Sequence, residues 1–336
     1  MGGFPAGALD ELDRKIVVAL QHDGRASWTS VAAFAGGSVS TVARRGQQLI
    51  SAGIVTVGAI PTLGSEGPVQ SFIVRINTTP GQQARVAERL IRSPYVRFLT
   101  LVTGKHDIVA EVVVPSDRGQ IPHSMMELQQ TEGIERWRSD LLTHTYKVSF
   151  DWGRQLYEQD ASPTPPDHLM PPPNTCEPAH FDEVDRVILA ELRHDGRATF
   201  QALGQKLGMS ESSVRRRVDR MRADGCLTIV TSVPSFALGM GAETWIQLRV
   251  EPARINEVAE QLGRHVAVRF LAAGLDENSL FCEVILPSTE RLHDFVADTM
   301  GKLPGVRGWS AYMELVFLKR GFMETRWWRS QFGLEA

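Results

Sequence analysis

The chain repeats one long segment of its own sequence. The segment that begins at Asp13 returns without a gap from Asp185, at a constant offset of 172 residues, and 16 of the 41 positions up to Gly53 are identical. Solenoid repeats have periods of about 20–50 residues, so this duplication is of another kind. Within 336 residues, it predicts one unit of about 150 residues, itself long enough for two small domains, present twice.

Each copy opens with a segment that is predicted to form three short helices. Apolar residues recur at helical spacing, and Gly24 and Gly196 are expected to end the first helices in the left-handed conformation. A tight glycine-containing turn between two short helices is typical of a helix-turn-helix. The expected N-caps of the second and third helices are Ser27, Ser38, Thr199 and Ser210.

The remainder of each copy is rich in Val, Ile and Phe and alternates strand-like with helix-like segments in the order βαββαβ. This order predicts a ferredoxin-like sandwich, in which helices cover one face of the sheet and the other face is free to pack on a partner. The fold class is therefore α+β, with two copies of a winged-helix-like helix-turn-helix domain and a ferredoxin-like domain.

The repeat and the composition together predict six segments. Residues 161–180 are rich in proline and lack periodicity, which favours an extended linker. The expected boundaries are 8–57 and 181–230 for the helix-turn-helix domains, 58–157 and 231–320 for the sandwich domains, 158–180 for the linker and 321–336 for a tail.

The third helix of each copy has an apolar face and a Ser/Arg face. At 100° per residue, Val214, Val218 and Met221 point one way and the hydroxyl and guanidinium side chains point the other. Arginine can pair with guanine edges in a major groove, and hydroxyls can hold phosphates. A solvated surface helix can look the same, but the recurrence of the pattern after the same capped turn favours DNA binding. The candidate DNA-binding residues are Ser40, Thr41, Arg44, Arg45, Gln48, Ser212, Ser213, Arg215, Arg216, Arg217 and Arg220.

The two third helices are expected to differ. Gly46 stands where the second copy has Val218, so the first helix lacks one apolar anchor and its module is expected to be looser. Loss of Arg216 is accordingly expected to weaken DNA binding more than loss of Arg44.

Charge and motifs exclude several classes of protein. A net charge of −3 argues against a histone-like chain, and no apolar run is long enough for a membrane span or a signal peptide. A soluble, cytoplasmic, nucleoid-associated protein is expected. The sequence has no GxSxG, Walker, HExxH or GxGxxG motif, and its three cysteines form no CxxC. No catalytic residue, metal or cofactor is expected.

The order of these motifs resembles the Lrp/AsnC (feast/famine) family of transcription regulators. The resemblance rests on the Leu-Asp start, the Asp-Gly-Arg turn, the SxSxVxRR-like third helix and the Gly-Lys-His-Asp segment at 104–107, and it covers nearly all of both copies. It implies double-stranded DNA as a partner and sensing of a small molecule, such as an amino acid, in the sandwich. It also implies sandwich domains that pair face to face, either within one chain or between chains.

The resemblance assigns effector contacts to the first copy at Gly104 and Asp107. In the second copy, Gly274 and Asp276 are the corresponding candidates, although the spacing there is altered. Glycine and aspartate are also turn formers, so a plain β-turn is the alternative role for these residues.

Two other readings compete with a regulator. Sirohaem decarboxylases are similar to Lrp/AsnC proteins and also pair two related units. They are expected to carry a His/Arg-rich pocket and a Tyr-Asn-x-Trp-like strand, whereas the matching strands here read DIVAEVVV and SLFCEVIL. The second alternative is a ligand-sensing module whose helix-turn-helices are vestigial. It fits a loose first module but leaves the Ser/Arg face of the second unexplained.

Overall fold

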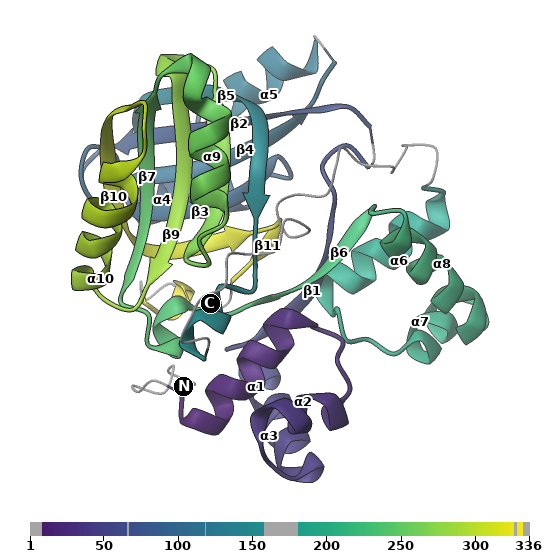
Figure 1. Ribbon diagram of the computed structural model, residues 1–336. Helices are drawn as coiled ribbons and strands as arrows, with labels where there is room; N and C mark the ends of the chain where they lie inside the picture. The colour runs from purple at the N-terminus through teal and green to yellow at the C-terminus, as the bar shows by residue number, and fades with distance from the viewer. Residues whose placement is uncertain (1–8, 66, 118, 158–180, 326–327, 332–336) are drawn as a thin grey trace. The chain divides into compact units, whose positions relative to one another are not determined.

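The structure is a computed structural model that describes residues 9–65, 67–117, 119–157, 181–325 and 328–331 (Figure 1). These residues group into two units, one that holds the described parts of 9–69 and 181–233 and one that holds the rest. The expected linker, 158–180, lies outside the described residues. Each unit therefore combines equivalent segments of the two copies.

Each half of the first unit contains the three predicted helices, followed by a strand that was not predicted. All four predicted N-caps are confirmed, because each side chain accepts a hydrogen bond from the backbone N–H three residues later. Gly36 and Gly208 end the second helices with φ of 79° and 66°, in the left-handed region. The elements are α1 (Glu11–His22), α2 (Trp28–Ala35), α3 (Val39–Ser51), β1 (Thr56–Pro61), α6 (Glu183–His194), α7 (Phe200–Leu207), α8 (Glu211–Ala223) and β6 (Leu227–Ser232).

The prediction for Gly24 and Gly196 is wrong. The caps of α1 and α6 are extended residues, and neither glycine has a positive φ. Both glycines instead allow a close approach of β1. A Cβ at Gly24 would lie 2.8 Å from Cγ1 of Val57, and one at Gly196 would lie 2.8 Å from the backbone nitrogen of Gly58.

Strands β1 and β6 pair antiparallel and join the two three-helix modules. The register runs from Thr56 opposite Ser232 to Pro61 opposite Leu227. The helix-turn-helix domains of the two copies thus form an internal pair within one chain.

The second unit confirms the predicted βαββαβ order in both copies. The unit also contains a short strand, β11 (Met323–Glu324), and a short helix, α11 (Trp328–Gln331). Its short helical turns are η1 (Trp152–Leu156), η4 (Ser235–Leu238), η5 (Pro252–Arg254), η6 (Asp276–Asn278), η7 (Phe295–Thr299) and η8 (Met300–Lys302). The first copy supplies β2 (Val69–Thr78), α4 (Gln83–Ile91), β3 (Val96–Val102), β4 (Ile108–Pro115), α5 (Gln120–Gln129) and β5 (Ile134–Val148). The second supplies β7 (Ala242–Val250), α9 (Ile255–Gly263), β8 (Val268–Gly274), β9 (Ser279–Leu286), α10 (Thr289–Asp294) and β10 (Val306–Arg320).

The strands of the two copies form one closed barrel. Their order is β11-β10-β3-β4-β2-β5-β8-β9-β7, and β10 also pairs with β7, which closes the ring. The seams between copies are the antiparallel pairs β5–β8 and β10–β3. Helices α9 and α10 pack on the outside (Figure 1), so the sheet face that was expected to seek a partner lines the interior. The partner is the other copy of the same chain.

Buried lysines mark the same relation between the copies. Lys147 and Lys319, one in each copy, each donate hydrogen bonds of 2.8–2.9 Å from Nζ to two backbone carbonyls of the other copy.

Among the helices that the structure describes, none has the length and apolar character needed to cross a membrane.

Candidate nucleic-acid interface

The third helices α3 and α8 divide into the two faces that their sequences predict. Val42 and Leu49 are buried in α3, as are Val214, Val218 and Met221 in α8. The side chains predicted to contact DNA lie on the other faces, and most of them are exposed. The exposed ones are Ser40, Arg44, Gln48, Ser212, Arg215, Arg216 and Arg220, and the half-buried ones are Thr41, Arg45, Ser213 and Arg217.

Several of these arginines are held by carboxylates of their own module. Arg45 forms ion pairs with Asp10 and Asp13 at the start of α1. The hydrogen bond with Asp10 is the main cause that raises the pKa of Arg45. A cation already paired in this way fixes the orientation of α3 on α1, and it is a weaker candidate for a phosphate contact.

The second copy repeats this arrangement. Arg217 pairs with Asp182 and Asp185 at 2.7 and 2.9 Å, and Arg220 pairs with Asp185. Asp185 is fully buried and also completes a capping box with Asp182. On the exposed side of α8, Arg215 pairs with Glu211 at 2.8 Å.

Arg44 and Arg216 differ from these paired arginines. They are equivalent residues of the two copies and both are exposed. Arg44 donates to Oε1 of Gln48 at 3.1 Å, and no hydrogen bond or ion pair to the Arg216 side chain occurs within the described residues. Among the described residues, Arg44, Arg216 and the exposed Arg222 of α8 therefore form no ion pair, so these guanidinium groups of α3 and α8 remain available to an anionic partner.

The apolar space beside Gly46 is filled by another side chain. A Cβ at Gly46 would lie 2.4 Å from Cη2 of Trp28, so the indole ring of α2 occupies the place where α8 has Val218. The equivalent of Trp28 in the second copy is the smaller Phe200. The expectation that α3 lacks an apolar anchor is thus corrected, because Trp28 supplies it.

The effector candidates of the first copy lie in the turn between β3 and β4. Gly104 has a φ of 93°, and a Cβ there would lie 3.2 Å from Cδ1 of Tyr312 in β10. Oδ2 of Asp107 accepts hydrogen bonds from the backbone N–H and the hydroxyl of Thr78, at 2.7 and 3.1 Å. His106 lies in the same turn, and its ring contacts Tyr312. Burial lowers the pKa of His106 to about 4. This turn lies beside the β10–β3 seam.

The candidates of the second copy lie beside the other seam. A Cβ at Gly274 would lie 2.6 Å from Cε2 of Phe281. Asp276 pairs with Arg138 of β5 at 2.6 Å, and the hydrogen bond from this arginine is the main cause that lowers the Asp276 pKa. The structure therefore places each candidate pair at a seam between the copies, without bringing the two pairs together.

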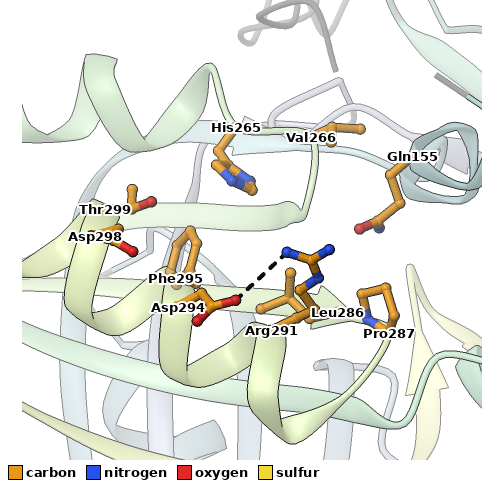
Figure 2. Close-up of a pocket in the computed structure, with 10 residues that line it drawn as sticks. All are labelled: Gln155, His265, Val266, Leu286, Pro287, Arg291, Asp294, Phe295, Asp298 and Thr299. Carbon is orange, nitrogen blue, oxygen red and sulfur yellow. Dashed lines mark ion pairs between the residues drawn. The ribbon is translucent and has the colours of Figure 1, made fainter. Parts of the chain in front are cut away.

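Sequence reasoning missed a cavity of about 400 Å³ in the second unit (Figure 2). His265 points into it, with Nδ1 accepting from the backbone N–H of Ala267 at 3.2 Å and its pKa lowered by burial. Ion pairs engage the charged side chains of the wall: Arg291 with Asp294 at 3.6 Å, and Asp298 with Lys302 at 2.8 Å. Nothing in the repeat signals this cavity.

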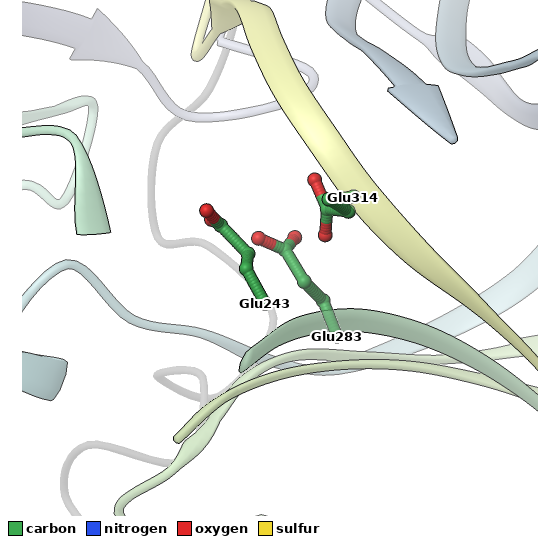
Figure 3. Close-up of side chains that lie close together, drawn as sticks. All are labelled: Glu243, Glu283 and Glu314. Atoms are coloured by element: carbon green, nitrogen blue, oxygen red, sulfur yellow. The ribbon is translucent and has the colours of Figure 1, made fainter. Parts of the chain in front are cut away.

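A second unpredicted feature is a buried acidic cluster inside the barrel (Figure 3). Oxygens of Glu243, Glu283 and Glu314 lie within 4.8 Å of one another, as metal ligands do. Arg320 donates to Glu243 and Glu283 at 2.8 and 2.6 Å, and Arg269 donates to Glu283. Two of the three carboxylates therefore already have cationic partners, which makes this donor set a poor fit for a metal ion.

Glu314 is the unbalanced member of this cluster. Both of its oxygens are buried and lack a hydrogen-bond partner among the described residues. Burial, followed by the charges of Glu283 and Glu243, raises its pKa well above the ordinary value. The equivalent residue of the first copy is Leu142, so the acid is specific to the second copy.

Three family models match the chain. The AsnC-type helix-turn-helix domain matches residues 9–50 and 181–222. The Lrp/AsnC ligand binding domain matches 71–151, and the PF0864 C-terminal dimeric alpha+beta barrel domain matches 247–325. Both modules of the first unit and both halves of the barrel are thus similar to known domains.

Curated relatives correspond to about one copy each. The uncharacterized HTH-type transcriptional regulator PF1231 of Pyrococcus furiosus is 32% identical over 128 residues, which are 38% of this chain and 86% of that protein. The HTH-type transcriptional regulator LrpA of Pyrococcus horikoshii is 31% identical over 127 residues, which are 38% of this chain and 90% of LrpA.

Solved structures of the siroheme decarboxylase NirDL are similar over nearly the whole chain. One of them has a TM-score of 0.58 at 14% identity, and the match covers 96% of this chain and 99% of that chain. At this identity the likeness concerns the fold alone. It shows that two helix-turn-helix segments and two sandwich segments occur in this arrangement in another protein.

Proposed function

The chain belongs to the Lrp/AsnC family of helix-turn-helix regulators, and from this premise we propose that it is a sequence-specific, DNA-binding transcription regulator of the cytoplasm and nucleoid. The observation that carries the proposal is the pair of third helices. Each begins at a serine N-cap, buries one apolar face and presents an exposed arginine, Arg44 or Arg216, on the other. Such a face suits a major groove.

The remaining candidate residues have supporting roles in this proposal. The hydroxyls at the starts of α3 and α8 and the side chain of Gln48 hold phosphates or base edges. Arg45, Arg217 and Arg220 act mainly through their ion pairs, which orient α3 and α8 on α1 and α6. The expected asymmetry stays in the proposal, because α8 carries the exposed Arg222 where the first copy has Ile50.

A small amino-acid-like effector is part of the proposal. The candidate contacts are Gly104 and Asp107 at one seam of the barrel and Gly274 and Asp276 at the other. Beside the first pair, Thr103 donates from its backbone N–H to the carbonyl of Met313 in the other copy, and at the second seam Asp276 pairs with Arg138. An effector that competes for them changes how tightly the copies pair, which gives it a route to alter DNA binding.

Fluorescence anisotropy tests the proposal. DNA from upstream of the protein's own gene, genomic fragments and scrambled DNA are titrated at several salt concentrations. Specific binding about 10³-fold tighter than background, with a salt slope of about −0.9 per neutralised phosphate, is expected. Arg216→Ala should weaken it, whereas Arg186→Ala, an exposed arginine of α6 paired with Glu183, should not. Absence of specific binding to every fragment contradicts the proposal.

A second candidate function is a decarboxylase that acts on a tetrapyrrole. The observation that raises it is the fold shared with NirDL over nearly the whole chain. Against it, the matching barrel strands read DIVAEVVV and SLFCEVIL and lack the expected Tyr-Asn-x-Trp-like sequence. Titration with iron-uroporphyrin distinguishes the two functions, because a bound porphyrin shifts its own absorbance band. A shift with micromolar affinity or tighter favours the enzyme.

A further inference from the structure

The Asp-Gly-Arg turn is repeated in both copies, and the proposed DNA contacts give its arginine no role. In the structure, the arginine of each copy reaches into the other copy. Arg25 donates from Nη1 and Nη2 to the backbone carbonyls of Gly196 and Ala198, at 2.5 and 3.0 Å. Both acceptors belong to the equivalent turn of the second copy.

The second arginine returns the same contact. Arg197 donates from Nη1 and Nη2 to the carbonyls of Gly24 and Ala26, at 2.6 and 3.0 Å. The four hydrogen bonds therefore relate the copies by an approximate two-fold axis, as in an isologous dimer interface. Each planar guanidinium donates from two nitrogens at once, a geometry that the single ammonium group of lysine cannot reproduce.

Aromatic side chains complete the contact. Arg25 lies over the ring of Phe200 at 4.5 Å from its centroid, and Arg197 lies over Trp28 at 4.4 Å. These rings are the first residues of α7 and α2, the helices that precede the DNA-facing helices. Trp28 also packs against Gly46 of α3. Arg197 is thus connected to α3 through the side chain of Trp28. Arg25 is connected to α8 through the short helix α7, which begins at Phe200.

The charges make this interface demanding in geometry. Burial lowers the pKa of both arginines, and the charge of Arg197 further lowers that of Arg25. Their hydrogen bonds go to carbonyls, and no ion pair to either guanidinium is found among the described residues. Two half-buried like charges are tolerated only where carbonyls and ring faces are placed to meet them. A small shift between the copies would leave them unsatisfied.

From this geometry we propose that Arg25 and Arg197 are positioning residues that together form a reciprocal clamp. The clamp fixes the separation and rotation of α3 relative to α8, and so selects the half-site spacing that the protein accepts. The β1–β6 pair and the packing of Ala59 into the core of the second module also join the copies. To these contacts the guanidinium groups add four directional hydrogen bonds between the two turns. The inference rests on the proposed function, since spacing matters only if both helices read DNA.

A distance measurement tests the clamp without DNA. Spin labels on unnatural amino acids replace Gln47 and Asp219, exposed and equivalent residues of α3 and α8. Wild type should give a narrow distance distribution, and R25K/R197K a clearly broader one. The matched control exchanges Arg14 and Arg186, equivalent arginines of α1 and α6, for lysine. A distribution that stays narrow in R25K/R197K overturns the clamp.

A spacing series tests its consequence for recognition. The two half-sites of a selected operator are moved apart by two base pairs, which rotates one by about 70° relative to the other. Wild type should bind the altered site about tenfold more weakly, because only one helix then contributes fully. R25K/R197K should discriminate less than about threefold, with unchanged affinity for a single half-site. Unchanged affinity for that half-site shows that the variant is folded.

The outcomes separate the two claims. Discrimination by R25K/R197K equal to that of wild type overturns the clamp, and so does a wild type that binds its operator but tolerates both spacings. If wild type binds no DNA specifically, the proposed function fails, and the distance measurement alone decides the clamp.

Discussion

Replacement of Glu314 by leucine should stabilise the barrel. Leucine is what the first copy has at the equivalent position, where Leu142 is half-buried. An unpartnered buried polar group costs roughly 1–3 kcal/mol, and a buried leucine side chain contributes roughly 1.5–3 kcal/mol. Because leucine must repack beside Arg269 and Arg320, we expect a net gain of roughly 2 kcal/mol in the free energy of unfolding at neutral pH.

The gain should depend on pH in a definite direction. The pKa of Glu314 is raised above its ordinary value of 4.5 in the folded protein. The contribution of protonated Glu314 to the free energy of unfolding is thus fully present below pH 4.5, and it is lost as pH rises through the folded-state pKa. The advantage of E314L over wild type should therefore grow as pH rises above 4.5, by at most about 1.4 kcal/mol per pH unit for one proton.

Hydrogen exchange of the β7 and β10 amides between pH 5 and pH 8 measures this free energy, after correction for intrinsic exchange rates. E314Q keeps the shape and removes the charge, so it should abolish the pH dependence contributed by this residue. E257Q, at an exposed position of α9, is the matched control and should change little. A leucine variant that is less stable than wild type at pH 8, or an advantage that shrinks as pH rises, would refute the reasoning.

Three further predictions concern the first unit. Gly46→Ala should lower its stability by about 1–3 kcal/mol, because the new methyl group meets the ring of Trp28; thermal melting measures this, and an unchanged melting temperature would contradict it. Arg216→Ala should weaken specific DNA binding more than Arg44→Ala in anisotropy titrations, and equal losses would remove the asymmetry. Asp185→Ala should destabilise the second module by about 3 kcal/mol, since it leaves two arginines without their shared buried partner; urea unfolding of the variant checks this.

Sequence reasoning predicted the elements well because local signals set them. The N-caps Ser27, Ser38, Thr199 and Ser210 act through hydrogen bonds to the next turn of the chain, which is information carried in three or four residues. The alternation of apolar residues likewise marks the strands. The repeat added that both copies share one fold.

The cross-copy contacts could not be predicted from either copy alone. The arginine of the Asp-Gly-Arg turn donates to carbonyls 171–173 residues away. In the barrel, Lys147 and Lys319 donate to carbonyls of the other copy that are 116 and 228 residues away. The prediction for Gly24 was wrong for a similar reason. The residue has to be small because strands β1 and β6, which are distant in sequence, pack against it, and not because it ends a helix. The repeat indicates that such contacts come in pairs, but it does not say which residues meet.

The candidate site shows the same limit. The pattern at 100° per residue separated buried from exposed positions on α8, since one helix determines that division. It could not show that Arg217 and Arg220 are held by Asp185, because those carboxylates come from another helix. The acidic cluster was not predicted for the same reason, since its three glutamates come from three different strands, β7, β9 and β10.

The central claim is that one chain supplies both halves of a DNA-binding pair. The most direct test is a footprint on the genomic fragment that the protein selects, with the number of chains in the complex measured by native mass spectrometry. One chain should protect two unequal half-sites about one helical turn apart. No enriched fragment, or protection of one half-site per chain, would contradict it.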